Sequence, residues 1–439
     1  MRTAFVLASA ALLSCSGSNG DAGSSGTGGM GGMSSGGAVA AAGTSSGAMG
    51  GVVNPPASGG SGAVAATGGV SSTSGTGGST ATGGGGATSS AGTTSAGGTT
   101  SSGGATNSGG TTNSGGATGP GGTNSGGSAG SGGAAPSCGI PTLDPSKPPA
   151  TLTLTGDLGT HDPSLILANG VYYLFATGNG IATKTSTTLL DWKGTPDVFS
   201  SIPSWVAGKI SGVTNVWAPD ISFFGRKYHL YYAVSSFGSN KSCIGHATRD
   251  SLSAGAWADH GSVICSNVGT TDDWNAIDPN VIVDDTGTPW LDFGSFWSGI
   301  KLIQLDADGN RVGTQVRGIA SHSSIEGPFI VHQCGYYYLF VSFGACCGNP
   351  YDYNVRVGRS KTVTGPYVDK AGTDMMNSGG TQVVQGNSTW TAPGHNAVLV
   401  TSKGAYNVYH ALNASHANPT LRISELVLDA QGWPVSAGP

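Results

Sequence analysis

Apolar and aromatic runs divide the chain after residue 137 into five units with the same order of predicted strands. Every unit begins with a short apolar run, continues through a turn that contains glycine, and reaches a second run rich in aromatic and β-branched residues. A third run follows. Turn residues separate the runs, which predicts strands.

The first strands are expected at Ser164–Leu167, Ile221–Phe224, Asn280–Val283, Phe329–Val331 and Ala397–Val400. The second strands are expected at Tyr172–Thr177, Tyr228–Val234, Pro289–Ser295, Tyr336–Ser342 and Ala405–Ala411. The third strands are expected at Ile181–Thr185, Ile244–Thr248, Ile300–Leu305, Val355–Ser360 and Leu421–Leu428. A further strand is expected at Thr151–Thr155, where threonine and leucine alternate.

A polar residue with proline or glycine close by precedes the strands of every unit, at intervals of roughly 50 to 70 positions, as in a repeat architecture. These residues are Asp162, Asp220, Asp278, Glu326 and His395. Short strands without a convincing helical period predict an all-β, five-bladed β-propeller. A β-sandwich is the alternative, but it would not repeat one polar signature. Because first strands line the channel of a propeller, we expect the five side chains to converge at one mouth.

The first 137 residues differ in composition from the predicted propeller at 138–439. Residues 1–15 resemble a lipoprotein signal peptide, with a positive charge at Arg2, an apolar core, and a lipobox-like sequence before Cys15. An ordinary signal peptide with an incidental cysteine is the alternative. Residues 16–137 are almost entirely Gly, Ser, Thr and Ala, so little apolar surface offsets the entropy of ordering them. We therefore expect a bacterial lipoprotein at the cell surface or outer membrane, held by a disordered tether or released as a secreted form.

The charge of the chain argues against one class of binding partner. The chain has 18 basic and 23 acidic residues and a net charge of −5, and it has no basic stripe, which argues against nucleic acid. No apolar run is long enough for a membrane-spanning helix, so Cys15 is the expected membrane anchor. A monomer is expected.

Six of the seven cysteines follow Cys15, and an even number in an exported protein favours disulfides. Cys243 and Cys265 fall within one unit and are expected to pair. Cys346 and Cys347 either bond to each other in a strained ring, bond to separate partners, or remain thiols. The connectivity that includes Cys138 and Cys334 is left open.

Carboxylates that face one another in a partly enclosed channel suit acid–base chemistry, because repulsion and burial raise the pKa of some while donors keep others ionised. Such pairs cleave glycosidic bonds: a protonated acid donates to the leaving oxygen while an ionised partner activates water or attacks the sugar. Aromatic residues that could face a sugar stand nearby, although each one alone is more often a core residue. They are Trp217, Trp274, Phe296 and Trp297.

The order of short motifs resembles glycoside hydrolase family 43, and within it the endo-1,5-α-L-arabinanases. The motifs are His161-Asp162-Pro163-Ser164, Trp217-Ala218-Pro219-Asp220, Phe237-Gly238-Ser239-Asn240, Asn275-Ala276-Ile277-Asp278-Pro279, Ser295-Phe296-Trp297, Ile325-Glu326-Gly327-Pro328, Tyr353-Asn354-Val355-Arg356-Val357-Gly358-Arg359-Ser360 and Gly394-His395-Asn396. The resemblance covers about Thr155 to Pro434. It implies a five-bladed propeller that cleaves arabinan, the side chains of pectin, with inversion at the anomeric carbon.

The resemblance also implies a role for each matching residue. Asp162 would be the general base, Glu326 the general acid, and Asp278 the residue that tunes the pKa of the acid and orients it. His395 would help to hold one calcium or other cation in the channel through water, and Asp220 receives no chemical role. Substrate-binding positions would be Asp162, Gly238, Asn275, Ala276, Ile277, Asp278, Ser295, Phe296 and Trp297.

Two other functions remain open at this point. An exo-acting α-L-arabinofuranosidase or β-xylosidase of the same family would use the same carboxylates. A non-catalytic carbohydrate-binding propeller would require a broken catalytic trio, and all three residues of the trio are present.

Overall fold

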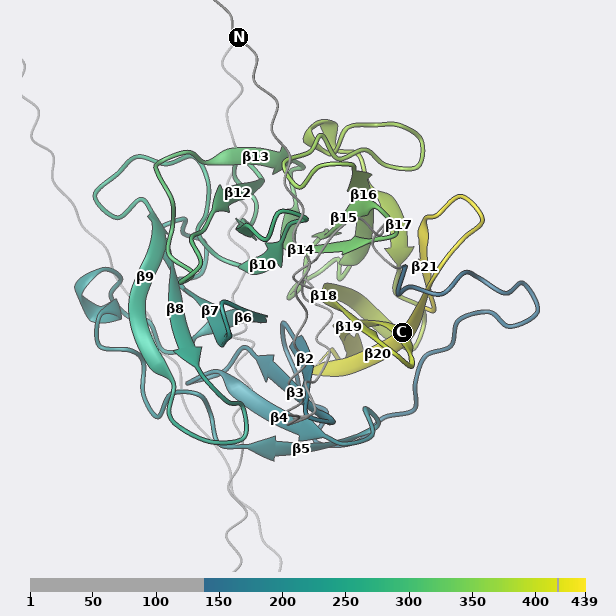
Figure 1. The fold of residues 1–439 in the computed structure, drawn as a ribbon, viewed down its shortest axis with the longest axis horizontal. Coiled ribbons are helices and arrows are strands. Elements are labelled where there is room, and N and C mark those ends of the chain that lie inside the picture. The colour runs from purple at the N-terminus through teal and green to yellow at the C-terminus, as the bar shows by residue number, and fades with distance from the viewer. Residues whose placement is uncertain (1–137, 417) are drawn as a thin grey trace, which may run out of the picture. The chain divides into compact units, whose positions relative to one another are not determined.

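The computed structural model describes residues 138–416 and 418–439, which form five sheets around a common centre (Figure 1). Each sheet is one blade made of four consecutive antiparallel strands, and the first blade gains a fifth, parallel strand at its outer edge. The described residues contain only two short 3-10 turns besides the strands, η1 (Val206–Gly208) and η2 (Met375–Asn377). The predicted all-β, five-bladed β-propeller is therefore confirmed.

Blade one contains β2 (Ser164–Ala168), β3 (Val171–Ala176), β4 (Ala182–Ser186) and β5 (Asp191–Thr195), with β1 (Thr155–Gly156) beside β5. Blade two contains β6 (Trp217–Phe224), β7 (Lys227–Val234), β8 (Ser242–Arg249) and β9 (Ala258–Ser266). Blade three contains β10 (Asn280–Val283), β11 (Pro289–Phe293), β12 (Ile300–Gln304) and β13 (Arg317–Ala320). Blade four contains β14 (Ile325–Gln333), β15 (Tyr336–Phe343), β16 (Asn354–Ser360) and β17 (Thr381–Val384). Blade five contains β18 (Trp390–Thr401), β19 (Gly404–Asn413), β20 (Pro419–Leu428) and β21 (Pro434–Ser436).

Each predicted first, second and third strand overlaps a strand of the corresponding blade. The strand predicted at Thr151–Thr155 is wrong. Thr151 forms only an isolated bridge with Ser424, and Leu152 donates its N–H to Ile423 at 2.8 Å. The alternating segment thus pairs at separate points with β20 of the last blade, because β21 covers only the C-terminal part of β20.

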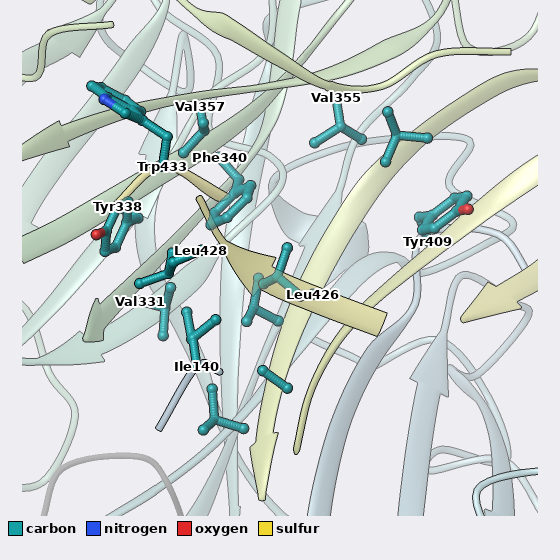
Figure 2. Packing of buried hydrophobic residues seen from close by; sticks show 14 residues of the cluster. Ile140, Val331, Tyr338, Phe340, Val355, Val357, Tyr409, Leu426, Leu428 and Trp433 are labelled. Carbon is teal, nitrogen blue, oxygen red and sulfur yellow. The ribbon is translucent and has the colours of Figure 1, made fainter. Parts of the chain in front are cut away.

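Apolar side chains fill the space between every pair of neighbouring blades, in five clusters. The cluster between blades four and five contains Val331, Phe340 and Leu426, packed as Figure 2 shows. Burial of one such side chain stabilises the fold by about 1.5–3 kcal/mol. Both faces of each blade are buried against its neighbours, so strands such as β7 and β15 are buried along nearly their whole length.

The N-terminal segment of the described chain closes the ring. Ile140 packs in the cluster between blades four and five, and Leu143 donates its N–H to Leu428 of blade five at 2.7 Å. Further along, β1 pairs with β5 of blade one. A disulfide between Cys138 and Cys334 attaches the start of the segment to the turn between β14 and β15. Blades four, five and one are therefore joined by one segment, although no strand is exchanged between the first and last sheets.

Two further disulfides are present. The predicted pair Cys243–Cys265 is confirmed and joins opposite residues of β8 and β9. Cys346 and Cys347 bond to each other, which selects one of the three possibilities left open by the sequence. Within the part of the chain that the structure describes, no helix is long and apolar enough to cross a membrane.

Candidate active site

A backbone turn in the left-handed region occurs at the start of every inner strand. The residues in this conformation are Asp162, Ala218, Asp278, Gly327 and His395, with φ values of 51°, 42°, 57°, 55° and 49°. They occupy equivalent places in the five blades. The repeat identified in the sequence is therefore real, but two polar residues are out of register: Glu326 lies one position before this turn, and Asp220 lies two positions after it.

The position of Asp220 corrects the expectation that all five polar side chains meet at the mouth. Asp220 accepts hydrogen bonds from the side chains of Ser164 and Asn280 at 3.2 and 3.1 Å, and from the N–H of Val281 at 3.0 Å. It lines a channel cavity of about 90 Å³ whose other walls are mostly aliphatic residues of the inner strands. Burial raises its pKa to about 6, although these hydrogen bonds oppose the rise. Asp220 joins blades one, two and three inside the channel and stays without a chemical role.

Asp162 is a buried carboxylate surrounded by donors. Its Oδ2 accepts a hydrogen bond from Thr177 Oγ1 at 2.6 Å and lies 3.1 Å from His161 Nδ1, while its Oδ1 lies 3.2 Å from His395 Nδ1. Burial alone would raise its pKa, but the imidazoles of His161, His395 and His410 outweigh burial and hold the pKa of Asp162 far below its usual range. The group is ionised at every pH at which the protein would work.

The three imidazoles differ in charge. Burial lowers the pKa of His161, but the charge of Asp162 and the hydrogen bond to it outweigh burial and leave this pKa raised. Burial lowers the pKa of His395 and of His410, so both rings are neutral near pH 7 and contribute positive charge beside Asp162 only at lower pH, where they bind a proton. His410 Nδ1 accepts the backbone N–H of Asp162 at 3.2 Å, so it carries no proton of its own to give to the carboxylate.

Asp278 and Glu326 form a second, contrasting group at the same mouth. Burial raises the pKa of Asp278 well above its usual value, and the charges of Glu326 and Asp162 raise it further. Burial also raises the pKa of Glu326, although the hydrogen bond from Ser295 Oγ to Glu326 Oε2, 2.8 Å long, opposes the rise. Two buried carboxyls that repel each other share protons instead of both ionising. The mouth thus holds one ionised carboxylate, Asp162, and a coupled pair of carboxyls that retains a proton.

Aromatic side chains lie on blades two and three at this mouth. Phe296 and Trp297 follow β11 and are 36% and 47% exposed, and Phe237 is 68% exposed, with its ring 6.3 Å from that of Trp217. Both Phe296 and Trp297 have positive φ, 52° and 41°, which is rare for bulky residues and marks functional sites. Hydrogen bonds from Phe296 N to Ile325 O and from Gly299 N to Phe296 O, both 2.7 Å, hold this turn.

The other predicted substrate positions divide into open and buried ones. Gly238 has a φ of 74° in the turn that follows exposed Phe237, and nothing lies where its Cβ would be. Asn275, Ala276 and Ile277 are buried. The side chain of Asn275 accepts a hydrogen bond from Ser242 Oγ at 2.6 Å. Trp274 is also buried, against Phe293 of the core, and so is no sugar platform.

The donor atoms around His395 decide which kind of cation could bind there. Among the described residues, two groups bring metal-ligating atoms within 4.8 Å of one another, and His395 belongs to neither. One group is His161, Asp162 and His410; the other is His161, Cys346 and Cys347. The described residues therefore form no direct ligand cage that includes His395, so a cation at this imidazole would have to be bound through water.

Sequence reasoning missed several residues that shape the site. His410 lies in β19, a strand rich in aromatic residues. The sequence pattern of this strand indicates only that the residue is buried. Thr177 donates to Asp162 and also accepts the N–H of Ala218 at 2.8 Å, and Ser342 Oγ accepts the N–H of His395 at 2.8 Å. The buried hydroxyl of Tyr353 lies beside Glu326 and Ser342, and its interaction with Glu326 opposes the rise in the pKa of that carboxyl. Of these missed residues, only Tyr353 lies in one of the short motifs that could have marked it in the sequence.

Acid–base chemistry between an ionised and a protonated carboxyl group, next to exposed aromatic rings, is the chemistry of glycoside hydrolysis. Comparison with known proteins agrees. The sequence profile of glycosyl hydrolases family 43 matches residues 155–434, so the chain belongs to this family and is a glycoside hydrolase.

Relatives in this family include enzymes with both endo and exo action. The chain is 40% identical over 285 residues to an extracellular endo-α-(1→5)-L-arabinanase of Bacillus subtilis, covering 62% of this chain and 86% of that protein. It is 39% identical over 298 residues to an extracellular exo-α-(1→5)-L-arabinofuranosidase of Cellvibrio japonicus, covering 62% and 85%. The structure of an endo-arabinanase from Bacillus licheniformis is similar, with a TM-score of 0.61 and 44% identity, over 65% of this chain and 99% of that one.

Proposed function

We propose that this protein hydrolyses 1,5-α-L-arabinofuranosidic linkages within arabinan chains, with inversion at the anomeric carbon. The observation that carries the proposal is the contrast at the channel mouth between ionised Asp162 and the coupled pair of Asp278 and Glu326, whose raised pKa values keep a proton on the pair. An inverting glycosidase needs one carboxylate to activate water and one carboxylic acid to protonate the leaving group. The relatives named above act on the same linkage.

In the proposed reaction, Asp162 accepts a proton from a water molecule as its oxygen attacks the anomeric carbon. The bond from that carbon to the leaving oxygen breaks, and Glu326 transfers its proton to this oxygen. Exchange with solvent then removes the proton from Asp162 and returns one to Glu326. The imidazoles and Thr177 hold Asp162 ionised and oriented before the water binds.

Asp278 acts on the acid. Its charge disfavours ionisation of Glu326, and its Oδ2 accepts the N–H of Gly327 at 3.0 Å, which fixes the turn that carries the acid. In this proposal Asp278 gives no proton to the substrate. It is a positioning residue that keeps the proton on Glu326.

The sugar-binding surface in the proposal consists of the predicted positions around these carboxyls. Phe296 and Trp297 would stack on sugar rings, Gly238 leaves room beside Phe237, and Ser295 orients Glu326. Asn275 to Ile277 would act mainly by supporting the wall of the cleft, because they are buried.

An exo-acting enzyme of the same family is the second candidate, and one of the similar relatives has this activity. Early products from linear 1,5-arabinan distinguish the two. We expect a mixture of arabino-oligosaccharides in the first few per cent of reaction. Arabinose, or one short oligosaccharide, as the sole early product would refute endo action, and activity on xylan but not arabinan would refute the substrate.

The proposal places the enzyme outside the cytoplasm, in keeping with its extracellular relatives. It includes a monomeric catalytic domain at 138–439, lipid attachment at Cys15 and a disordered tether at 16–137; these last two lie outside the described residues. Partition of the expressed protein into detergent, lost in Cys15→Ser, tests the anchor. A calcium ion held through water by His395 is also proposed, and chelation followed by calorimetric titration with calcium tests it.

A further inference from the structure

The loop between β15 and β16 brings the bonded pair Cys346–Cys347 to the catalytic mouth. Cys347 Sγ lies 3.6 Å from His161 Nε2, and the other nitrogen of this ring faces Asp162. Cys346 packs against a small cluster that includes Tyr353. Through these two contacts, one loop of blade four reaches the base on blade one and the tyrosine near the acid.

A disulfide between neighbouring residues cannot stabilise the fold as the other two do. Disulfides stabilise mainly by closing loops of the unfolded chain, and the gain grows with the loop. Cys138–Cys334 spans a sequence separation of 196 and Cys243–Cys265 one of 22, whereas Cys346–Cys347 spans 1. We therefore look for an effect of this disulfide in the surface that its two sulfur atoms form at the mouth.

That surface is suited to a sugar. Both cysteines are partly exposed, and divalent sulfur is polarisable and weakly polar, so it makes favourable contacts with apolar faces. The aromatic residues exposed at the mouth, Phe237, Phe296 and Trp297, come from blades two and three. Within the described part of the chain, no large hydrophobic residue of blade five is exposed. The disulfide thus supplies apolar surface beside His161, from a blade that contributes none of these aromatic rings.

We propose that the Cys346–Cys347 disulfide is a substrate-contacting platform, on which the C–H face of an arabinofuranose ring packs beside the linkage to be cleaved. This inference rests on the proposed function and adds a specificity element to it. The closed ring fixes the position of the two sulfurs relative to each other, with Cys347 Sγ held beside His161. Two separate thiols would rotate independently, would be more polar, and would place a proton donor beside His161.

The test compares Cys346→Ser/Cys347→Ser with Cys243→Ser/Cys265→Ser, a matched control that removes a disulfide within blade two. For linear arabino-oligosaccharides, loss of the vicinal pair should raise KM by about two- to tenfold, the range of a sulfur contact, with the smaller part of the change in kcat. The control should keep the KM of the wild type. Mild reduction of the wild-type protein by a water-soluble phosphine should raise KM by the same factor, and reoxidation should restore it. Mass spectrometry locates the disulfide that was reduced. This second measurement remains informative if the variant folds poorly.

An unchanged KM in the vicinal variant and after reduction would overturn the platform while leaving arabinan hydrolysis intact. A fall confined to kcat would also overturn it, because the pair would then act through His161. Free thiols in the protein purified without reductant, with one zinc ion bound per chain, would replace the platform by a metal site of His161 and the two sulfurs. Absence of activity on arabinan in the wild type would instead refute the proposed function.

Discussion

Asp278 accepts the backbone N–H of Gly327 at 3.0 Å, so the carboxyl of blade three is hydrogen-bonded to the turn that carries Glu326 on blade four. Glycine fits at 327 because a Cβ there would lie only 3.1 Å from His395 Nδ1, so a larger residue would have to displace the imidazole. The two carboxyls are therefore fixed relative to each other by backbone, and not only by flexible side chains.

Asp278→Asn should move the alkaline limb of the activity profile to lower pH. The acid must be protonated to act, so activity is lost as pH rises through the pKa of Glu326. Removal of the negative charge of Asp278 lowers that pKa, because the two groups repel each other in their ionised forms. The dependence of kcat/KM on pH measures the limb. An unchanged limb with reduced kcat would assign Asp278 a purely structural role.

Glu326→Gln should reduce kcat on arabinan by about 10²–10⁴-fold, the usual contribution of a general acid. A 2,4-dinitrophenyl arabino-oligosaccharide has a leaving group that needs no proton, so its hydrolysis should fall far less. The ratio of the two losses is the measurement, and the circular dichroism spectrum is the control for folding. Equal losses on both substrates would argue against the acid role.

The acidic limb of the wild-type pH–activity profile should lie at unusually low pH. The imidazoles around Asp162 outweigh its burial and hold its pKa far below the usual range, so the base loses its charge only in strong acid. Activity should therefore persist as pH falls until the fold itself is lost. His395→Ala removes one of these imidazoles and should raise the acidic limb. A wild-type limb at the ordinary aspartate pKa would contradict the arrangement around Asp162.

The Cys138–Cys334 disulfide should matter for stability and not for chemistry. It attaches the closing segment to blade four across a sequence separation of 196. Cys138→Ser/Cys334→Ser should lower the free energy of unfolding by about 2–4 kcal/mol. Denaturant unfolding measures this, and kcat at low temperature should match the wild type. Unchanged stability would mean that the hydrogen bonds of the segment suffice to close the ring.

The blades were predictable because their strands are short runs of apolar and aromatic residues, and because glycine-containing turns separate the strands. The left-handed turn before each inner strand was not predictable, since Asp, Ala, Gly and His all occupy it. This is why Glu326 and Asp220 were placed in a common ring that the backbone does not form. Asp220 differs from Asp162 only in register, yet two residues along a strand move its side chain into the channel.

The sequence motifs predict Asp162, Asp278 and Glu326 as the catalytic trio, whereas they do not predict the environment of these carboxyls. His410 and Ser342 lie in strands whose only visible pattern is burial, and each reaches the site across a blade boundary. Such contacts depend on how neighbouring sheets are stacked, which spacing along one chain does not encode. The closing role of Cys138 was hidden for the same reason, since six cysteines allow many pairings.

In the proposed reaction, Asp162 directs water to one face of the sugar while Glu326 protonates the leaving oxygen on the other. Proton NMR of the first product formed from linear 1,5-α-arabinan, recorded before the anomers equilibrate, tests this arrangement. We expect the new reducing end to appear first as the β-anomer and to convert to the α-anomer by mutarotation. Initial appearance of the α-anomer would mean retention, and would contradict the assignment of Asp162 as a base.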